Sequence, residues 1–483
     1  MRYFMVVFFL FGFGNFAKSL DLDTAKVFLL GGNGNEVMYK AIPTNDTGFF
    51  MVGTTGSFGE YFTSVYAIKL DSLGNKVWSN TYGINQINYA YSALELPSGN
   101  KFICGYSYDS LDYNGTLYKI DAAGNLIFSK QIGGLDWDFI YDIKQLEENK
   151  LVLCGNTFSN SSSYGNGYIV CVDTLGNVLW ENQFNNENYE TYLKSVCVYN
   201  GSIYSVGKVK NGAIEKYIIY KISTDGNEEL KFIDESIDGS YFNKIISVSA
   251  GQLAAVGVKK ISNSDGSFNH EIMLCHFGEN LNLQNTLMMV GENTEEGSDL
   301  IQLSTGELSI IGFTNTYGGG GFDVSQYRCS ELGEVVFTSS TYGNLGDEKG
   351  FSLCLNKRNR IVFVGSSTSV NYNAINTDAM WIVFKYPNVE PGYFQTNNHQ
   401  IDNLNPVSII EDEFAQAKNN LNVFSDRLEI LGKYYYVLFA TDGKLINEGE
   451  FENQLVFPKI SSGLYYIKVY NNVNVYSKKI IKN

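Results

Sequence analysis

Short apolar segments that end in glycine recur along the first four fifths of the chain. Met51-Val52-Gly53 and Ile103-Cys104-Gly105 are the first two of them. The seven glycines are Gly53, Gly105, Gly155, Gly207, Gly257, Gly312 and Gly365, which lie 52, 50, 52, 50, 55 and 53 residues apart. A near-constant period of about fifty residues, with several short β segments in each unit, is typical of a β-propeller.

The second unit shows how one blade is built. Four alternating or apolar segments predict strands over Tyr91–Leu96, Phe102–Gly105, Thr116–Ile120 and Leu126–Ser129. Pro97–Asn100 and Asp121–Asn125 are turns, because Gly and Asn tolerate positive φ and Asp can accept hydrogen bonds from its own turn. The sequence therefore predicts blades of four antiparallel strands joined mostly by short turns.

The ring is predicted to close with a strand from the other end of the propeller. The third-strand pattern occurs seven times, but after the last, which ends at Tyr386, Pro387 breaks the pattern and no fourth strand follows. Lys26–Leu30 aligns with the fourth strands that begin at Lys76 and Leu126. We expect it to complete the seventh blade and so remove an exposed edge. Residues 20–386 are thus predicted to form a seven-bladed β-propeller.

The first residues have the features of a secretory signal peptide. Arg2 precedes an apolar run from Tyr3 to Phe13, and Ala17-Lys18-Ser19 supplies small residues for cleavage after Ser19. The run is too short for a stable membrane-spanning helix, and no later segment is apolar for long enough. Residues 1–19 are therefore expected to direct export, and no membrane span is expected.

Charge and cysteine content narrow the partners and the chemistry. A formal net charge of -16 argues against nucleic acid and anionic membranes as partners. The seven cysteines are odd in number and mostly lie in apolar strands, so buried free thiols are favoured over a disulfide framework. A bridge between Cys154 and Cys171 is the less favoured alternative. No CxxC pair is present, which excludes a zinc ribbon.

A separate unit is predicted at the C-terminus. Residues 387–419 lack periodicity and are interpreted as a linker. From residue 420 to 483, six or seven short strands, with Asp442-Gly443 as a hairpin turn, predict a small β-sandwich.

Three elements of this unit resemble a known family. They are Asp442-Gly443-Lys444, Ser462-Gly463-Leu464-Tyr465 and Lys478-Lys479, and their order is similar to that in the type A C-terminal sorting domain of the type IX secretion system of Bacteroidetes-type bacteria. The resemblance implies export across the outer membrane by the type IX machinery, often with removal of this domain and attachment of the rest to the cell surface. An ordinary accessory sandwich is the alternative.

The repeats also resemble the exported propellers that often carry such sorting domains, and more distantly the quinoprotein-type propeller. The quinoprotein-like element is Asp71-x-x-Gly74 followed by Trp78, and it is repeated at Asp173 to Trp180. We interpret it as a packing device, which indicates fold and not cofactor.

Candidate ligand-binding residues gather on one face. The loops between second and third strands and those between blades emerge on the same side, and they are the long ones. They carry acids and aromatic residues, which suit sugar rings or cationic groups, and their oxygen atoms could hold Ca²⁺. The candidates are Asp136, Trp137, Asp138, Tyr189, Tyr241, Asp299 and Asp347. Alternatively, the acids only accept hydrogen bonds from the backbone, and the similar placement of Asp138, Asp299 and Asp347 favours that role.

No catalytic residue is predicted, and no cofactor or metal site apart from the Ca²⁺ that the oxygen-rich loops could hold. His270, His276 and His399 form neither a triad nor a ligand set. The favoured function is a secreted or cell-surface binding or scaffold propeller without catalysis, whose partner is a glycan or a surface protein. The alternative is a carbohydrate-active or quinoprotein-like enzyme, and a propeller glycosidase would need a unique pair of carboxylates facing a central pocket.

Overall fold

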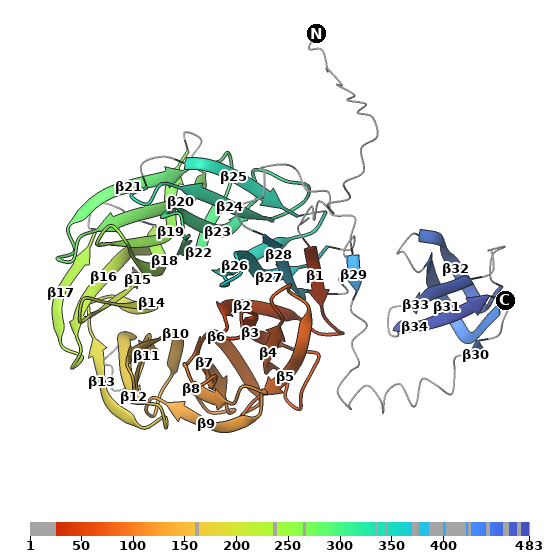
Figure 1. The fold of residues 1–483 in the computed structure, drawn as a ribbon, viewed down its shortest axis with the longest axis horizontal. Helices are drawn as coiled ribbons and strands as arrows, with labels where there is room; N and C mark the ends of the chain where they lie inside the picture. The colour runs from red at the N-terminus through yellow and green to blue at the C-terminus, as the bar shows by residue number, and fades with distance from the viewer. Residues whose placement is uncertain are drawn as a thin grey trace, which may run out of the picture.

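A computed structural model gives the fold (Figure 1). It describes residues 26–159, 164–234, 239–263, 267–333, 336–343, 345–369, 374, 376–385, 399–401, 422–423, 427–440, 445–456, 463–470 and 475–482. All regular elements in these ranges are β-strands. The predicted signal peptide, residues 1–19, lies outside them.

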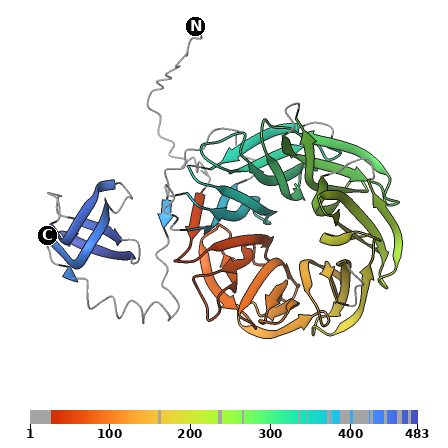
Figure 2. The ribbon, with the colours of Figure 1, turned by 180° about the vertical axis from the view of Figure 1, so that it is seen from behind.

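Seven sheets, each of four or five strands, are arranged in a ring, and each sheet is one blade (Figures 1 and 2). The first blade consists of β2 (Glu36–Pro43), β3 (Phe49–Thr55), β4 (Ser64–Leu70) and β5 (Lys76–Tyr82). The second consists of β6 (Ile87–Glu95), β7 (Lys101–Tyr108), β8 (Tyr113–Ile120) and β9 (Leu126–Ile132). The third consists of β10 (Asp138–Glu147), β11 (Lys150–Thr157), β12 (Asn166–Asp173) and β13 (Val178–Phe184). The predicted seven-bladed propeller of antiparallel blades is confirmed.

The next three blades repeat this order. They are β14 (Glu190–Tyr199), β15 (Ser202–Asn211), β16 (Ile214–Ser223) and β17 (Glu228–Ile233); β18 (Ser240–Val248), β19 (Gln252–Ser262), β20 (Phe268–Phe277) and β21 (Leu283–Met289); and β22 (Glu295–Gln302), β23 (Leu308–Thr314), β24 (Asp323–Cys329) and β25 (Val336–Tyr342). Several strands run further into the long loops than predicted, since β7 continues to Tyr108 and β19 to Ser262.

The seventh blade joins the two ends of the propeller. It contains β26 (Glu348–Leu355), β27 (Arg360–Ser367) and β28 (Asp378–Lys385), and its fourth strand is β1 (Lys26–Leu30), antiparallel to β28. The predicted closing strand is therefore confirmed. A short strand within the predicted linker, β29 (His399–Ile401), pairs with β1 in parallel.

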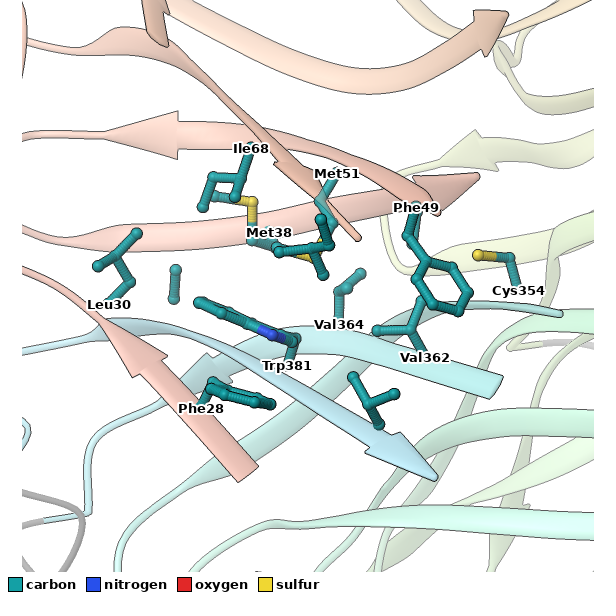
Figure 3. Packing of buried hydrophobic residues seen from close by; sticks show 14 of the residues in the cluster. Phe28, Leu30, Met38, Phe49, Met51, Ile68, Cys354, Val362, Val364 and Trp381 are labelled. Carbon is teal, nitrogen blue, oxygen red and sulfur yellow. The ribbon is translucent and has the colours of Figure 1, made fainter. Parts of the chain in front are cut away.

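Apolar packing supports this closure. The Phe28 ring stacks on the Trp381 ring with centroids 5.1 Å apart. Figure 3 shows both rings in one buried cluster with Met38, Met51 and Ile68 of the first blade. Closure of the ring therefore rests on burial of the β1 side chains together with the hydrogen bonds between β1 and β28.

The recurring glycine is explained by a bulge in the strand beside it. In every blade the first strand has one extra residue just after the position opposite the glycine. The bulge brings a main-chain carbonyl oxygen against the glycine, so that an added Cβ would lie only 1.7 to 2.0 Å from it at all seven glycines. These glycines are needed for close approach of two main chains, since none of the seven has positive φ.

The Asp-x-x-Gly-Asn turns hold neighbouring blades together. The Asp71 carboxylate accepts the N–H groups of Leu73 and Asn75, and Gly74 has φ of +87°. In two other blades the equivalent turn packs beneath a tryptophan of the preceding blade: Trp78 lies over Gly124, and Trp180 lies over Gly226. The contacts agree with the packing role expected for this element.

All seven cysteines are buried and free. Cys154 is paired in register with Ile169, and Cys171 with Val152, so the two thiols are not opposite each other. The preference for free thiols over a bridge is confirmed.

The described part of residues 422–482 is a sheet of five strands. They are β30 (Asn422–Val423), β31 (Arg427–Ala440), β32 (Leu445–Val456), β33 (Gly463–Tyr470) and β34 (Val475–Lys482), in the order β30-β31-β33-β34 with β32 also on β31. The strands are fewer and longer than the six or seven expected. Asp442, Gly443 and Lys444 lie outside the described residues, between the paired strands β31 and β32.

The bulge contact predicts a strong effect of one methyl group. In Gly207→Ala, the new Cβ would meet the Tyr192 carbonyl oxygen at 1.8 Å, so the strands must separate at a cost of about 1–3 kcal/mol. Urea unfolding of the mature chain would measure this loss. Gly56→Ala is the matched control, because its nearest neighbour lies at 3.4 Å, and equal stability of the two variants would contradict the explanation.

The closing strand predicts a second loss of stability. Deleting residues 20–35 removes β1 and leaves β28 as an open edge, so the melting temperature should fall relative to the mature chain. Deleting only residues 20–25, which stops short of β1, should have little effect. A melting temperature unchanged by the longer deletion would show that β1 does not close the ring.

Candidate functional site

The predicted rim residues are placed in different environments. Trp137, in the loop between β9 and β10, is 48% exposed, and its ring lies 5.4 Å from that of Tyr113. Asp136 beside it is exposed. Asp138 is fully buried, and its carboxylate accepts the N–H of Gly134 at 2.7 Å and the hydroxyl of Ser159 at 3.0 Å. Trp137 and Asp136 are accessible to a ligand, whereas Asp138 holds the loop.

Asp138, Asp299 and Asp347 are not equivalent, which corrects the sequence interpretation. Asp138 is the first residue of its strand, Asp299 is the fifth of β22, and Asp347 precedes β26. Asp347 is exposed and accepts the N–H of Phe322 at 2.9 Å. In the sequence all three residues lie near a loop between blades, but only the strand register shows that they occupy different positions in their strands.

The remaining two candidates are also separated. Tyr189 is half-buried and donates its N–H to the carbonyl of Asn186. Tyr241 lies on β18, with the Lys208 ammonium group 5.1 Å from the centre of its ring. The structure thus brings Asp136 and Trp137 together, but it does not gather the seven candidates into one site.

The residues that follow the seven bulges form a polar ring on the axis of the propeller. Figure 1 shows the first strand of each blade innermost. The ring consists of Lys40, Ser92, Asp142, Ser195, Lys244, Asp299 and Ser352, and we call it the axial polar ring. Sequence reasoning treated Asp299 as a rim residue and missed the other six.

Two ion pairs cross this ring. The Lys40 ammonium group lies 2.6 Å from Asp299 and that of Lys244 lies 2.7 Å from Asp142, so blade 1 is joined to blade 6 and blade 5 to blade 3. Ser92 and Ser195 donate to Asp142 at 2.7 and 2.8 Å. Both carboxylates are therefore hydrogen-bonded and paired.

The lysines also keep these carboxylates ionised. Burial alone would raise the pKa of Asp142, but Lys144 and Lys244 outweigh it and hold this pKa well below its usual range. Lys40 and Lys244 lower the pKa of Asp299 against the same effect of burial. Such permanently ionised, fully engaged carboxylates are suited to holding blades together.

A cluster of aromatic side chains lines the inner edge of the first three blades. Its members are half-buried. Each is either the extra residue of a bulge, the residue two positions before that extra residue, or the residue that follows the recurring glycine of the second strand. They are Tyr39, Tyr89, Tyr91, Tyr106, Phe139 and Tyr141, which we call the axial aromatic cluster. The sequence contains a sign of this cluster, because the first strands of the second and third blades each carry two aromatic residues separated by one residue.

The rings of this cluster touch across blade boundaries. Centroids lie 4.9 Å apart for Tyr39 and Tyr91, 5.5 Å for Tyr91 and Tyr141, and 4.9 Å for Tyr106 and Phe139. Tyr113 contacts both Tyr106 and Trp137, at 5.8 and 5.4 Å. A continuous aromatic surface therefore leads from the axis to the rim.

A lysine borders this surface. The Lys194 ammonium group lies 3.7 Å from the centre of the Tyr141 ring, which is a close cation–π contact. Burial lowers the pKa of Lys194 to about 8, and the neighbouring charge of Lys208 adds to the shift. The site thus combines aromatic faces with a desolvated amine.

No family model matches the chain, and no curated protein does. Solved structures similar to it include three whose sequence identity to this chain is low. The extracellular domain of a protein described as a hybrid two component system, BT3049, from B. thetaiotaomicron is 13% identical with a TM-score of 0.45; the match covers 95% of this chain and 58% of that one.

The β-propeller domain of the Trilobed protease from Pyrococcus furiosus is 11% identical, with a TM-score of 0.43 and coverage of 78% and 100%. The alpha-l-arabinofuranosidase arb93a from Fusarium graminearum is 11% identical, with a TM-score of 0.39 and coverage of 61% and 92%. Likenesses this distant carry no information on ligand or activity. No helix among the described residues is long and apolar enough to cross a membrane.

Proposed function

We propose that this chain is an exported, non-catalytic binding propeller that acts at the cell surface or in the surrounding medium. Its ligand is a glycan, held by stacking on the axial aromatic cluster and on Trp137. The observation that carries the proposal is the continuous aromatic surface from Tyr39 to Trp137. Flat aromatic faces with polar edges bury the apolar face of a sugar ring and leave its hydroxyl groups solvated or hydrogen-bonded.

The state of the axial carboxylates supports binding over hydrolysis. A glycosidase needs two carboxyl groups on either side of the scissile bond, one of them protonated as the general acid. Asp142 and Asp299 are both held ionised by lysines and bonded to serine hydroxyls. Neither of them meets the requirement for a general acid.

Type IX secretion is the proposed route of export. Two of the sorting-domain elements lie on neighbouring strands: Gly463 and Tyr465 on β33, and Lys478 and Lys479 on β34. These strands are antiparallel, with Tyr465 in register with Ile480. Proximity of the two elements supports a single recognition surface for the secretion machinery.

Glycan binding should depend on the rim tryptophan. On a glycan array, the mature chain from residue 20 should bind a subset of glycans, and Trp137→Ala should weaken that binding about tenfold, ~1.4 kcal/mol. Tyr317→Ala is the matched control, because Tyr317 is 54% exposed on the sixth blade. Equal loss in both variants would contradict the site, and hydrolysis of a bound glycan would favour the enzyme alternative.

Surface delivery should depend on residues 420–483. In a bacterium with type IX secretion, the full chain should reach the cell surface or the medium, whereas a chain that ends at Asn419 should remain in the periplasm. Immunoblots of fractionated cells would measure both. If the truncated chain still reached the surface, or if the full chain stayed in the periplasm, the sorting assignment would be wrong.

A further inference from the structure

Each junction between blades brings two particular side chains together. At four of these junctions, which we call seams, a residue at the start of a blade's first strand donates its N–H to the carbonyl just before the third strand of the preceding blade. The bonds run from Asn88 to Thr63, Thr191 to Gly165, Glu348 to Phe322 and Glu36 to Thr377, at 3.1, 2.8, 2.6 and 2.7 Å. The donor residue and the residue that follows the acceptor carbonyl are therefore neighbours across these four seams.

The seams divide into two classes. The equivalent pair at every seam consists of residues that are in register with the second-strand residue two after the recurring glycine of their own blade. Going round the ring, the pairs are Ser64 and Asn88, Asn114 and Asp138, Asn166 and Thr191, Lys216 and Ser240, Glu271 and Glu295, Asp323 and Glu348, and Asp378 and Glu36. The last three seams, which are consecutive, carry two carboxylates each. The other four carry one or none.

The seam between blades 6 and 7 shows the pair most clearly. Asp323 is 1% exposed and Glu348 is fully buried. Asp323 Oδ1 and Glu348 Oε2 lie 1.7 and 2.9 Å from the point that a Cβ on Gly343 would take, so both oxygens face the same small space. Asp323 Oδ2 accepts the N–H of Gly319 at 3.1 Å, whereas Oδ1 has no hydrogen-bond donor among the described residues.

Ser367 donates its hydroxyl to Glu348 Oε1 at 2.6 Å, and Ser369, two residues on, offers a further oxygen. Ser369 is fully buried, and its hydroxyl has no hydrogen-bond partner in the described part of the chain. Its N–H donates to the Ser367 hydroxyl at 3.1 Å, just as Ser159 donates to Thr157 at 3.0 Å. Ser159 uses its own hydroxyl to bind Asp138, so the equivalent Ser369 hydroxyl belongs beside Glu348.

The seam between blades 5 and 6 repeats the arrangement. Glu271 and Glu295 are 1% and 0% exposed, and Glu295 Oε2 lacks a hydrogen-bond donor among the described residues. Both carboxylates meet at Gly291, whose N–H donates to Glu271 at 2.9 Å. Two buried carboxylates therefore lie against one glycine at this seam as well.

We propose that these seams bind Ca²⁺, with Asp323, Glu348 and Ser369 as side-chain ligands at the seam between blades 6 and 7, and Glu271 and Glu295 at the seam before it. Two buried carboxylates carry the charge that a divalent cation neutralises. Every candidate ligand is an oxygen, which suits Ca²⁺ over softer metals. Among the described residues, no three His, Cys, Asp or Glu side chains are placed so that together they could hold a metal ion, so main-chain carbonyls and water complete the coordination.

The test compares the mature chain with and without calcium. After removal of metals with a chelator, millimolar CaCl₂ at pH 7.5 should raise the melting temperature by about 2 °C or more, and titration calorimetry should detect bound Ca²⁺. Asp323→Asn should remove one binding event. Without calcium the same substitution should raise the melting temperature, because it relieves the repulsion between Asp323 and Glu348.

The matched control is Asp138→Asn, the same substitution at a seam whose other member is Asn114. It should leave the number of bound Ca²⁺ ions unchanged. The proposal is wrong if CaCl₂ neither binds nor stabilises the mature chain, or if Asp323→Asn binds as many Ca²⁺ ions as the unsubstituted chain. The proposal is also wrong if a lower pH stabilises the mature chain while calcium does not, because the two carboxylates would then share a proton in place of binding the cation.

Discussion

The close contact between a bulged first strand and a glycine of the second strand determines the shape of every blade. The bulge adds one residue, so the main chain before it presses on the second strand and the residue after it turns toward the axis. Any side chain at the glycine would separate the two strands. The axial polar ring exists because this same contact is repeated seven times.

Charged residues in that ring connect blades that are not neighbours. Lys40 reaches past blade 7 to Asp299, and Lys244 reaches past blade 4 to Asp142. Removal of one partner from such a buried pair leaves an uncompensated charge, which costs about 3–5 kcal/mol. Apolar residues would pack as tightly, but they would not distinguish one blade from another. The ring therefore ties together blades that are not neighbours.

The repeat, the turns and the closing strand could be predicted from sequence because each depends on local chemistry. Gly207 and Asp71 are needed by their own strands or turns, and Lys26–Leu30 follows the pattern of a fourth strand. The site could not be predicted in the same way. Tyr39, Tyr91 and Tyr141 come together only when three blades are placed around one axis, and a bulge changes which residues face it.

The two halves of the propeller differ in their chemistry. Most axial aromatic rings lie on blades 1 to 3, and Phe351 of blade 7 adjoins them with its ring 5.4 Å from that of Tyr39. Paired carboxylates occupy the three consecutive seams from blade 5 round to blade 1. Extracellular calcium sites typically have affinities of about 10⁻⁴–10⁻³ M. Calcium at the proposed sites would therefore stiffen the two seams on either side of blade 6 only where its concentration reaches the millimolar range.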